Sequence, residues 1–224
     1  MRFLTTLFLA FGCLFAPMAS AQVIDVPGRP PIPSPSDKEN LLLLDLSTGG
    51  RVTILLRPDV APKMVERIKT LVREHFYDGL KFHRVIDGFM AQTGDPKGDG
   101  TGGSKLPDLK AEFNYLPHVR GVVSAARGQS EDSANSQFFI VFEPTLKLDK
   151  KYTAFGRVID GMEFVDAVER GEPPADPSRI LHAYIAADNP PPYTPAPAPA
   201  ANPDLGPAVT LPGAAPAATP KPQR

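Results

Sequence analysis

The chain has 224 residues, with 24 Lys and Arg against 25 Asp and Glu, and a formal net charge of −1. Such a balance gives no electrostatic footprint for nucleic acid or for an anionic membrane surface, so we expect neither as a partner. The 27 prolines are concentrated at the ends, with five in Pro27–Pro35 and twelve in Pro190–Pro222. Between them remain about 150 residues, enough for one good core.

The first 21 residues have the composition of a secretory signal peptide. Arg2 supplies a basic start, Phe3–Phe15 is mostly apolar, and Ala19–Ala21 offers small residues for cleavage. A buried N-terminal helix is the alternative. The apolar run falls short of the roughly 20 residues of a membrane-spanning helix, and we expect no membrane span. The predicted location is outside the cytoplasm, in the periplasm.

Cysteine usage agrees with export. The only cysteine, Cys13, lies inside the predicted signal peptide, so the mature chain would carry no thiol, which suits an oxidising compartment. The alternative is a lipoprotein anchored to the membrane through Cys13. Ala10 argues against it, because lipoprotein signals carry a branched aliphatic residue at that place.

Composition divides the rest of the chain into three parts. Residues 22–37 form a Pro-rich linker, residues 38–188 a folded domain, and residues 189–224 a Pro/Ala-rich tail that we expect to be disordered. We interpret the tail as a spacer, with a docking element as the alternative.

The domain begins with a predicted hairpin and a helix. Leu41–Leu46 and Arg51–Leu56 flank a turn at Ser47–Gly50. Pro62 suits the first turn of a helix. An apolar stripe at helical spacing follows, made of Met64, Val65, Ile68, Leu71 and Val72.

The remainder of the domain is predicted to be short strands with one further helix. That second helix is expected at Met162–Arg170, ended by Gly171. Hairpin-spaced strands with few crossover helices favour an antiparallel barrel over a parallel sheet. The predicted strands are Leu80–Ile86, Phe89–Thr93, Gly121–Ala125, Ser136–Phe142, Ala154–Ile159 and Ile180–Ala187.

The strand Ser136–Phe142 is predicted to face two environments. Alternation puts Phe138, Ile140 and Phe142 on one uniformly apolar face, which should point into the core. Gln137 and Phe139 share the other face, a polar residue beside an aromatic, which suits the wall of a groove. The pattern alone favours a second-layer core position for Phe139, with the groove wall as the alternative.

Three separated motifs resemble the cyclophilin family of peptidyl-prolyl cis-trans isomerases. Phe82–Asp95 reads FHRVIDGFMAQTGD, Gly100–Gly103 reads GTGG and Ser136–Ile140 reads SQFFI. The resemblance extends over residues 38–188. It implies a mainly β fold, a closed eight-stranded antiparallel barrel capped by two α-helices. It also implies isomerisation of X-Pro bonds without a cofactor or metal.

The resemblance also assigns residue roles. Arg84 matches the catalytic arginine, the donor to the proline imide nitrogen, and Gln92 matches the residue that orients the arginine and contacts the substrate backbone. A guanidinium stays charged and presents rigid N–H groups, as this role requires. The expected substrate-binding residues are Phe89, Met90, Ala126, Arg127, Gln137, Phe139, Leu148 and Tyr152.

Three positions in or next to this set depart from the commoner family pattern. Arg127 replaces an asparagine in a loop one residue longer, Lys147 stands where many members have tryptophan, and Tyr152 replaces a histidine. A phenol still donates a hydrogen bond, so catalysis is not excluded. The missing indole removes a contact used by the cyclic peptide inhibitor cyclosporin, and we expect weak inhibition.

Other patterns are rejected. Gly98-x-Gly100-x-x-Gly103 matches a dinucleotide fingerprint formally, but Pro107 follows in place of a helix, so we expect a glycine-rich loop here. The four histidines have no metal-ligand spacing. His83, beside Arg84, is expected to be a hydrogen-bonded packing histidine, with a catalytic role as the alternative. Two functions remain: a monomeric folding enzyme acting on proline-containing peptides and unfolded exported proteins, and a non-catalytic peptide-binding chaperone or scaffold using the same groove.

Overall fold

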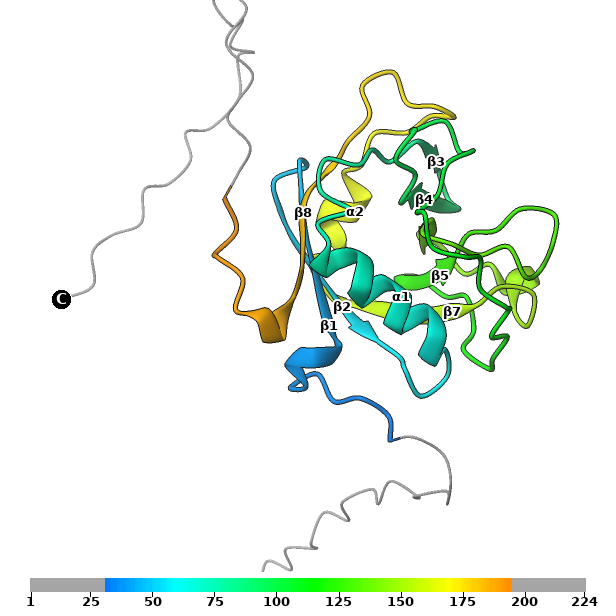
Figure 1. Ribbon diagram of the computed structural model, residues 1–224. Coiled ribbons are helices and arrows are strands. Elements are labelled where there is room, and N and C mark those ends of the chain that lie inside the picture. Colours follow the sequence, from blue (N-terminus) through cyan, green and yellow to red (C-terminus); the bar gives the residue numbers. More distant parts are fainter. Residues whose placement is uncertain (1–30, 195–224) are drawn as a thin grey trace, which may run out of the picture. The chain divides into compact units, whose positions relative to one another are not determined.

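The computed structural model describes residues 31–194, in which eight strands form one antiparallel sheet (Figure 1). The strands are β1 (Leu41–Leu46), β2 (Gly50–Leu56), β3 (Arg84–Ile86), β4 (Met90–Thr93), β5 (Val122–Ala125), β6 (Phe138–Val141), β7 (Ala154–Asp160) and β8 (Ile180–Ile185). The helices are α1 (Pro62–Arg73) and α2 (Met162–Asp166), with single 3₁₀ turns η1 (Lys38–Asn40), η2 (Leu146–Leu148) and η3 (Ala186–Asp188).

All eight strands and both helices lie where the sequence predicts them, and the mainly β, antiparallel class is confirmed. The second helix is shorter than predicted. It ends at Asp166, not at Arg170, and the Arg170 guanidinium donates to the main-chain carbonyl of Asp166. This side chain therefore satisfies a carbonyl that would accept from the next turn if the helix continued.

The prediction of a closed barrel is wrong. The sheet runs in the order β3-β4-β6-β5-β7-β2-β1-β8 and stays open between β3 and β8, curling into a half-barrel. The outer edge of β3 is occupied by another segment: Val85 and Gly171 exchange two backbone hydrogen bonds of 2.8 Å. Across the gap towards β8, Lys81 and Arg179 form an isolated antiparallel bridge.

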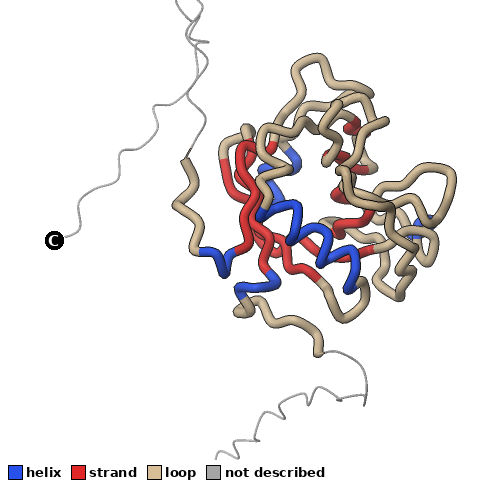
Figure 2. Tube along the Cα trace, viewed as in Figure 1, coloured by secondary structure: helices blue, strands red, loops and turns tan. Residues whose placement is uncertain are grey.

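The core forms two clusters on opposite faces of β6. The larger includes Phe138, Ile140 and Phe142, as well as all five residues of the predicted stripe on α1, which lies against the strands (Figure 2). The second apolar cluster contains Phe139 and Val141. The predicted division of this strand between two environments is confirmed.

The N-terminus of α1 is capped from a distant loop. Pro62 occupies the first turn and Ala61 offers no side-chain cap. The carboxylate of Glu112 instead accepts from the backbone amides of Lys63 and Met64, at 3.0 and 2.9 Å. An anion at this end satisfies free N–H groups and complements the helix dipole.

Residues after β8 contact the β1–β2 hairpin. Arg51 donates 2.8 Å to the carbonyl of Pro191, and the Tyr193 hydroxyl donates 3.1 Å to the carbonyl of Leu46. The predicted signal peptide, most of the linker and residues 195–224 of the tail lie outside the described residues. Within residues 31–194, no helix is long and apolar enough to cross a membrane.

Candidate active site

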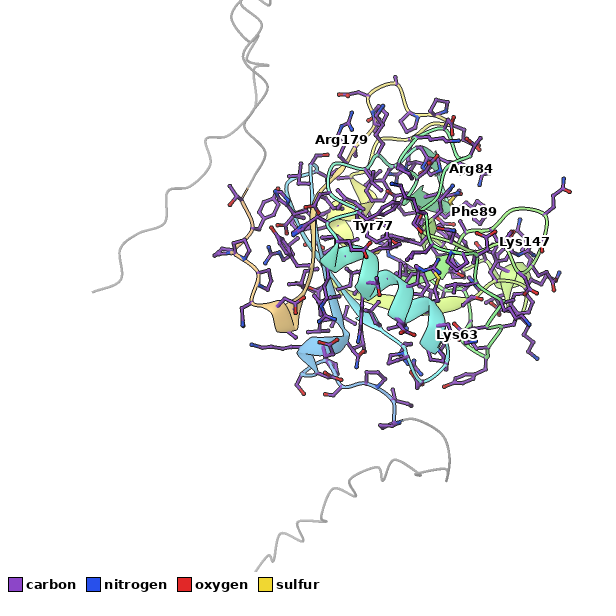
Figure 3. All side chains as sticks on the ribbon, in the orientation of Figure 1. Lys63, Tyr77, Arg84, Phe89, Lys147 and Arg179 are labelled. Atoms are coloured by element: carbon purple, nitrogen blue, oxygen red, sulfur yellow. The ribbon has the colours of Figure 1, made fainter. Side chains whose placement is uncertain are left out.

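Nine of the ten predicted site residues surround one cavity of about 120 Å³, although they come from four separated stretches of chain. The tenth, Gln137, lines a neighbouring polar pocket. Figure 3 places Arg84 and Phe89 on the same side of the domain. The residues that line the cavity are Arg84, Phe89, Met90, Gln92, Ala126, Arg127, Phe139, Leu148 and Tyr152.

Strand pairing explains how these side chains converge. Arg84 on β3 is paired with Gln92 on β4, and Gln92 is paired with Phe139 on β6. Directly paired residues of antiparallel strands project from the same face of the sheet. A guanidinium, an amide and a phenyl ring therefore stand in one row across three adjacent strands.

The floor of the cavity is apolar and closely packed. Met90 and Phe139 are buried, and Phe139 packs edge-on against Tyr152 with ring centroids 5.8 Å apart. On its other side Phe139 stacks against His118 at 6.3 Å. His118 is itself fixed between Asp149 and the Ser124 hydroxyl, at 2.9 and 3.0 Å. Such a floor can receive a small apolar ring.

Arg84 brings a partly exposed positive charge to the cavity. Its Nε donates to Oε2 of Glu172 at 2.7 Å, and its side chain is 42% exposed. Gln92 does not contact it by a hydrogen bond in the described part of the chain; the Gln92 amide donates 2.9 Å to Oε1 of Gln137. The sequence analysis missed Glu172, because it lies 88 residues from Arg84 and belongs to no motif.

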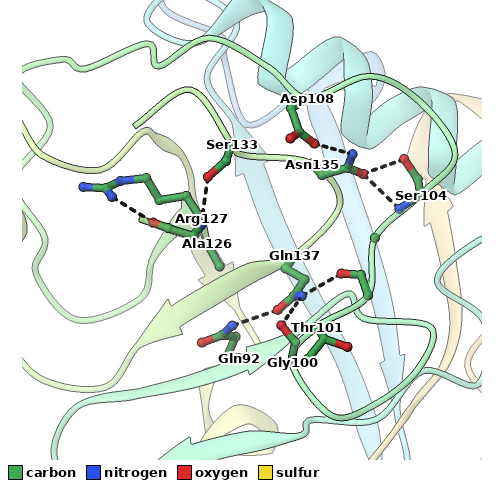
Figure 4. A pocket seen from close by; sticks show the side chains of 13 residues that line it. Gln92, Gly100, Thr101, Ser104, Asp108, Ala126, Arg127, Ser133, Asn135 and Gln137 are labelled. Carbon is green, nitrogen blue, oxygen red and sulfur yellow. Dashed lines mark hydrogen bonds between the residues drawn. The ribbon is translucent and has the colours of Figure 1, made fainter. Parts of the chain in front are cut away.

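A second, polar pocket of about 430 Å³ adjoins the first (Figure 4). The predicted glycine-rich loop forms one wall of it. Gln137 connects this loop to the site, since its amide nitrogen donates to the carbonyls of Gly100 and Gly102 at 3.0 and 2.8 Å while its oxygen accepts from Gln92. The two pockets share Gln92, Ala126 and Arg127.

The loop that departs from the common pattern is held by Arg127 and Ala126. The Arg127 guanidinium lies 4.7 Å from the centroid of the Tyr152 ring, a cation–π contact, and donates to the carbonyl of Gly128 at 3.0 Å. The Ala126 amide donates 2.9 Å to the carbonyl of Gln137. Arg127 thus braces the rim that both pockets share.

Comparison with known proteins agrees with this geometry. Residues 43–185 match the family model described as cyclophilin type peptidyl-prolyl cis-trans isomerase/CLD. The chain belongs to the cyclophilin family of peptidyl-prolyl cis-trans isomerases. The match covers the whole sheet apart from the first two residues of β1, so the family assignment rests on the elements that build the site.

Curated relatives carry the same activity in their names. A probable peptidyl-prolyl cis-trans isomerase of Brucella suis is 48% identical over an alignment 171 residues long, which covers 69% of this chain and 87% of that protein. Peptidyl-prolyl cis-trans isomerase B of Bacillus subtilis is 42% identical over 129 residues, 57% of this chain and 89% of that protein.

Solved cyclophilins share the fold. AquaCyp293 from Hirschia baltica superposes with a TM-score of 0.63 at 29% identity, over 68% of this chain and 76% of that one. A Cryptosporidium parvum cyclophilin, crystallised in the presence of the dipeptide Ala-Pro, superposes with a TM-score of 0.61 at 27% identity, over 65% of this chain and 98% of that one.

Proposed function

We propose that this cyclophilin accelerates X-Pro isomerisation during the folding of exported proteins, with Arg84 as the donor to the proline imide nitrogen. The observation that carries the proposal is the meeting of a charged donor, a polar amide and an apolar floor around one small cavity. A proline ring fits the chemistry of that floor. The Ala-Pro dipeptide used with the Cryptosporidium cyclophilin supports a proline-containing ligand for this site.

The chemistry needs neither a nucleophile nor a cofactor. Amide resonance sets a barrier of about 18–20 kcal/mol, so uncatalysed exchange at X-Pro takes tens to hundreds of seconds. As the amide twists, resonance is lost and the imide nitrogen gains a lone pair. A fixed donor aimed at that nitrogen stabilises the twisted form more than either planar form, which is what lowers a barrier.

The other site residues have supporting roles in this proposal. Phe139, Met90 and Phe89 hold the ring, while Gln92 and the backbone near Ala126 bind the flanking peptide. Leu148, Tyr152 and Arg127 complete the rim of the cavity. The rival function, a non-catalytic peptide-binding chaperone, would use the same floor but gives no reason for a guanidinium beside it.

The export part of the proposal rests on the N-terminal composition. Residues 1–21 would direct a monomer to the periplasm, with anchoring through Cys13 as the alternative. Expression of the full chain, followed by fractionation and mass measurement of the mature N-terminus, tests this. A mature chain starting near residue 22 supports periplasmic release, whereas a lipid-modified Cys13 supports anchoring.

Arg84→Ala tests the mechanism. Loss of one preorganised transition-state donor lowers turnover by roughly 10²–10³-fold. Arg84→Lys is the matched variant: it keeps the charge but loses the guanidinium geometry, and should recover little of the loss. Because Arg84 contributes little to the core, both variants should melt with the wild type. Wild-type turnover in a folded Arg84→Ala protein would leave the binding function as the better account.

A further inference from the structure

Within the described residues, Glu172 is the side chain that hydrogen-bonds to Arg84. Its Oε2 accepts from Nε of Arg84 at 2.7 Å, in a pair whose side chains are 42% and 50% exposed. Within residues 31–194, neither Nη1 nor Nη2 of Arg84 has a hydrogen-bond partner. The contact therefore holds the guanidinium at its inner nitrogen and leaves both terminal nitrogens free for a ligand in the cavity.

The backbone that carries Glu172 is locked to the strand that carries Arg84. Gly171 and Val85 exchange two hydrogen bonds of 2.8 Å. Glu172, which follows Gly171, is therefore held opposite Arg84, which precedes Val85. Gly171 has φ +146°, and a Cβ there would lie 2.6 Å from Cα of Pro174. Only glycine allows the chain to turn so sharply here.

Gln92 is engaged elsewhere. Its amide nitrogen donates to Gln137, which in turn holds the carbonyls of Gly100 and Gly102 (Figure 4). In this arrangement the glutamine connects the cavity to the glycine-rich loop. Orientation of the arginine is left to the carboxylate of Glu172.

We propose that Glu172 is a positioning residue for catalysis, which presents the terminal nitrogens of Arg84 to the imide nitrogen of the bound proline. The inference rests on the proposed role of Arg84. An unrestrained arginine has several rotatable bonds, and a partner that fixes Nε before the substrate binds removes part of the ordering cost from the reaction step. Because a carboxylate adds no attraction for a neutral proline ring, its contribution should appear in kcat and leave KM nearly unchanged.

The experiment is a set of steady-state measurements on an Ala-Pro test peptide. Glu172→Ala should lower kcat by about two- to fivefold, the effect expected from loss of an exposed ion pair with good geometry. Glu172→Gln retains an acceptor oxygen on a side chain of the same length, and should recover most of kcat. In the Arg84→Ala background, Glu172→Ala should have no further effect, because the side chain it positions is gone.

Asp188→Ala is the matched control. Asp188 pairs with Arg73 at 3.0 Å, and those side chains are 45% and 44% exposed, close to the values at the site. This pair joins α1 to η3 and contributes nothing to the cavity, so the variant should keep the wild-type kcat. Thermal melts of every variant separate a loss of folded protein from a loss of rate.

The outcomes divide cleanly. Loss in Arg84→Ala, a smaller loss in Glu172→Ala and no additional loss in the double variant support the inference. Wild-type kcat in Glu172→Ala, or losses that multiply in the double variant, overturn it while leaving the arginine mechanism intact. Wild-type turnover in Arg84→Ala overturns both.

Discussion

Asp95 organises the glycine-rich loop beside the active site, and Asp95→Ala should destabilise the domain substantially. The carboxylate is 1% exposed. Its Oδ1 accepts from the backbone amide of Lys97 at 2.8 Å, and its Oδ2 accepts from those of Asp99 and Gly100 at 3.0 and 2.6 Å. The alanine variant would leave these three amides without their acceptor.

The magnitude follows from these three contacts. A hydrogen bond to a charged group contributes about 1.5–3 kcal/mol, so three give an upper limit of roughly 4.5–9 kcal/mol. Asp99 and Gly100 are exposed, and water can reach part of the released loop. We therefore expect the free energy of unfolding to fall by about 3–5 kcal/mol, measured by urea titration at pH 7. Asp95→Asn keeps an acceptor oxygen but adds two donor hydrogens. Its free energy of unfolding should lie between those of the wild type and Asp95→Ala.

The pH dependence supplies an independent check. Burial by itself would raise the pKa of Asp95, but the surrounding backbone donors outweigh it and hold the pKa below its usual value. A carboxyl with a lowered pKa in the folded state contributes stability above its unfolded pKa of about 3.9 and loses it as the pH falls through the folded value. Wild type should therefore lose stability in acid more steeply than Asp95→Ala. A loss below about 1 kcal/mol at pH 7, with parallel acid profiles, would refute this account.

Three further predictions concern the cavity and its surroundings. Phe139→Ala removes the buried floor, and should lower the free energy of unfolding by about 3–5 kcal/mol together with turnover, measured by urea titration and peptide assay. Lys147→Trp should tighten cyclosporin inhibition by about tenfold or more, because the lysine Nζ lies 5.6 Å from the Phe89 ring centroid and an indole there would bury apolar surface; unchanged inhibition would place this residue outside the inhibitor's reach. Neither ring nitrogen of His83 has a hydrogen-bond partner within residues 31–194, so the expectation of a hydrogen-bonded histidine is wrong. Burial lowers the pKa of His83, so the unfolded state binds the proton more readily and stability should fall as pH decreases below about 6.5. His83→Gln should flatten that profile in thermal melts between pH 7 and 5.

The local sequence pattern was sufficient to predict the strands and helices of this fold. The strand Phe138–Val141 alternates strictly between two apolar clusters, and the stripe on α1 is buried along its whole length, because side-chain direction within one element depends only on its own period. The lengths of these elements were less well determined by the sequence. Helix α2 stops at Asp166, four residues before the predicted end, and the difference comes from an arginine side chain that competes for a backbone carbonyl.

The motifs located the candidate site through resemblance, and pairing of strands explains the result. Arg84, Gln92 and Phe139 converge because β3, β4 and β6 are neighbours in register. That register is decided by turns and by the burial of one face, neither of which the three motifs contain individually. Gln92 was expected to orient Arg84, but in the tertiary structure its amide donates to Gln137.

The sequence by itself determined the class of the fold and the order and type of its elements, and its resemblance to the family indicated nine residues that surround the cavity. Only the tertiary structure decided that the sheet stays open, that Glu172 holds Arg84, and that Asp95 gathers the amides of its loop. The physical reason is the same in each case. These contacts join segments, or depend on a backbone path, that no local period specifies: Gly171 occupies the edge of β3 only because the chain between α2 and β8 turns back onto it, and that return places Glu172 beside the arginine.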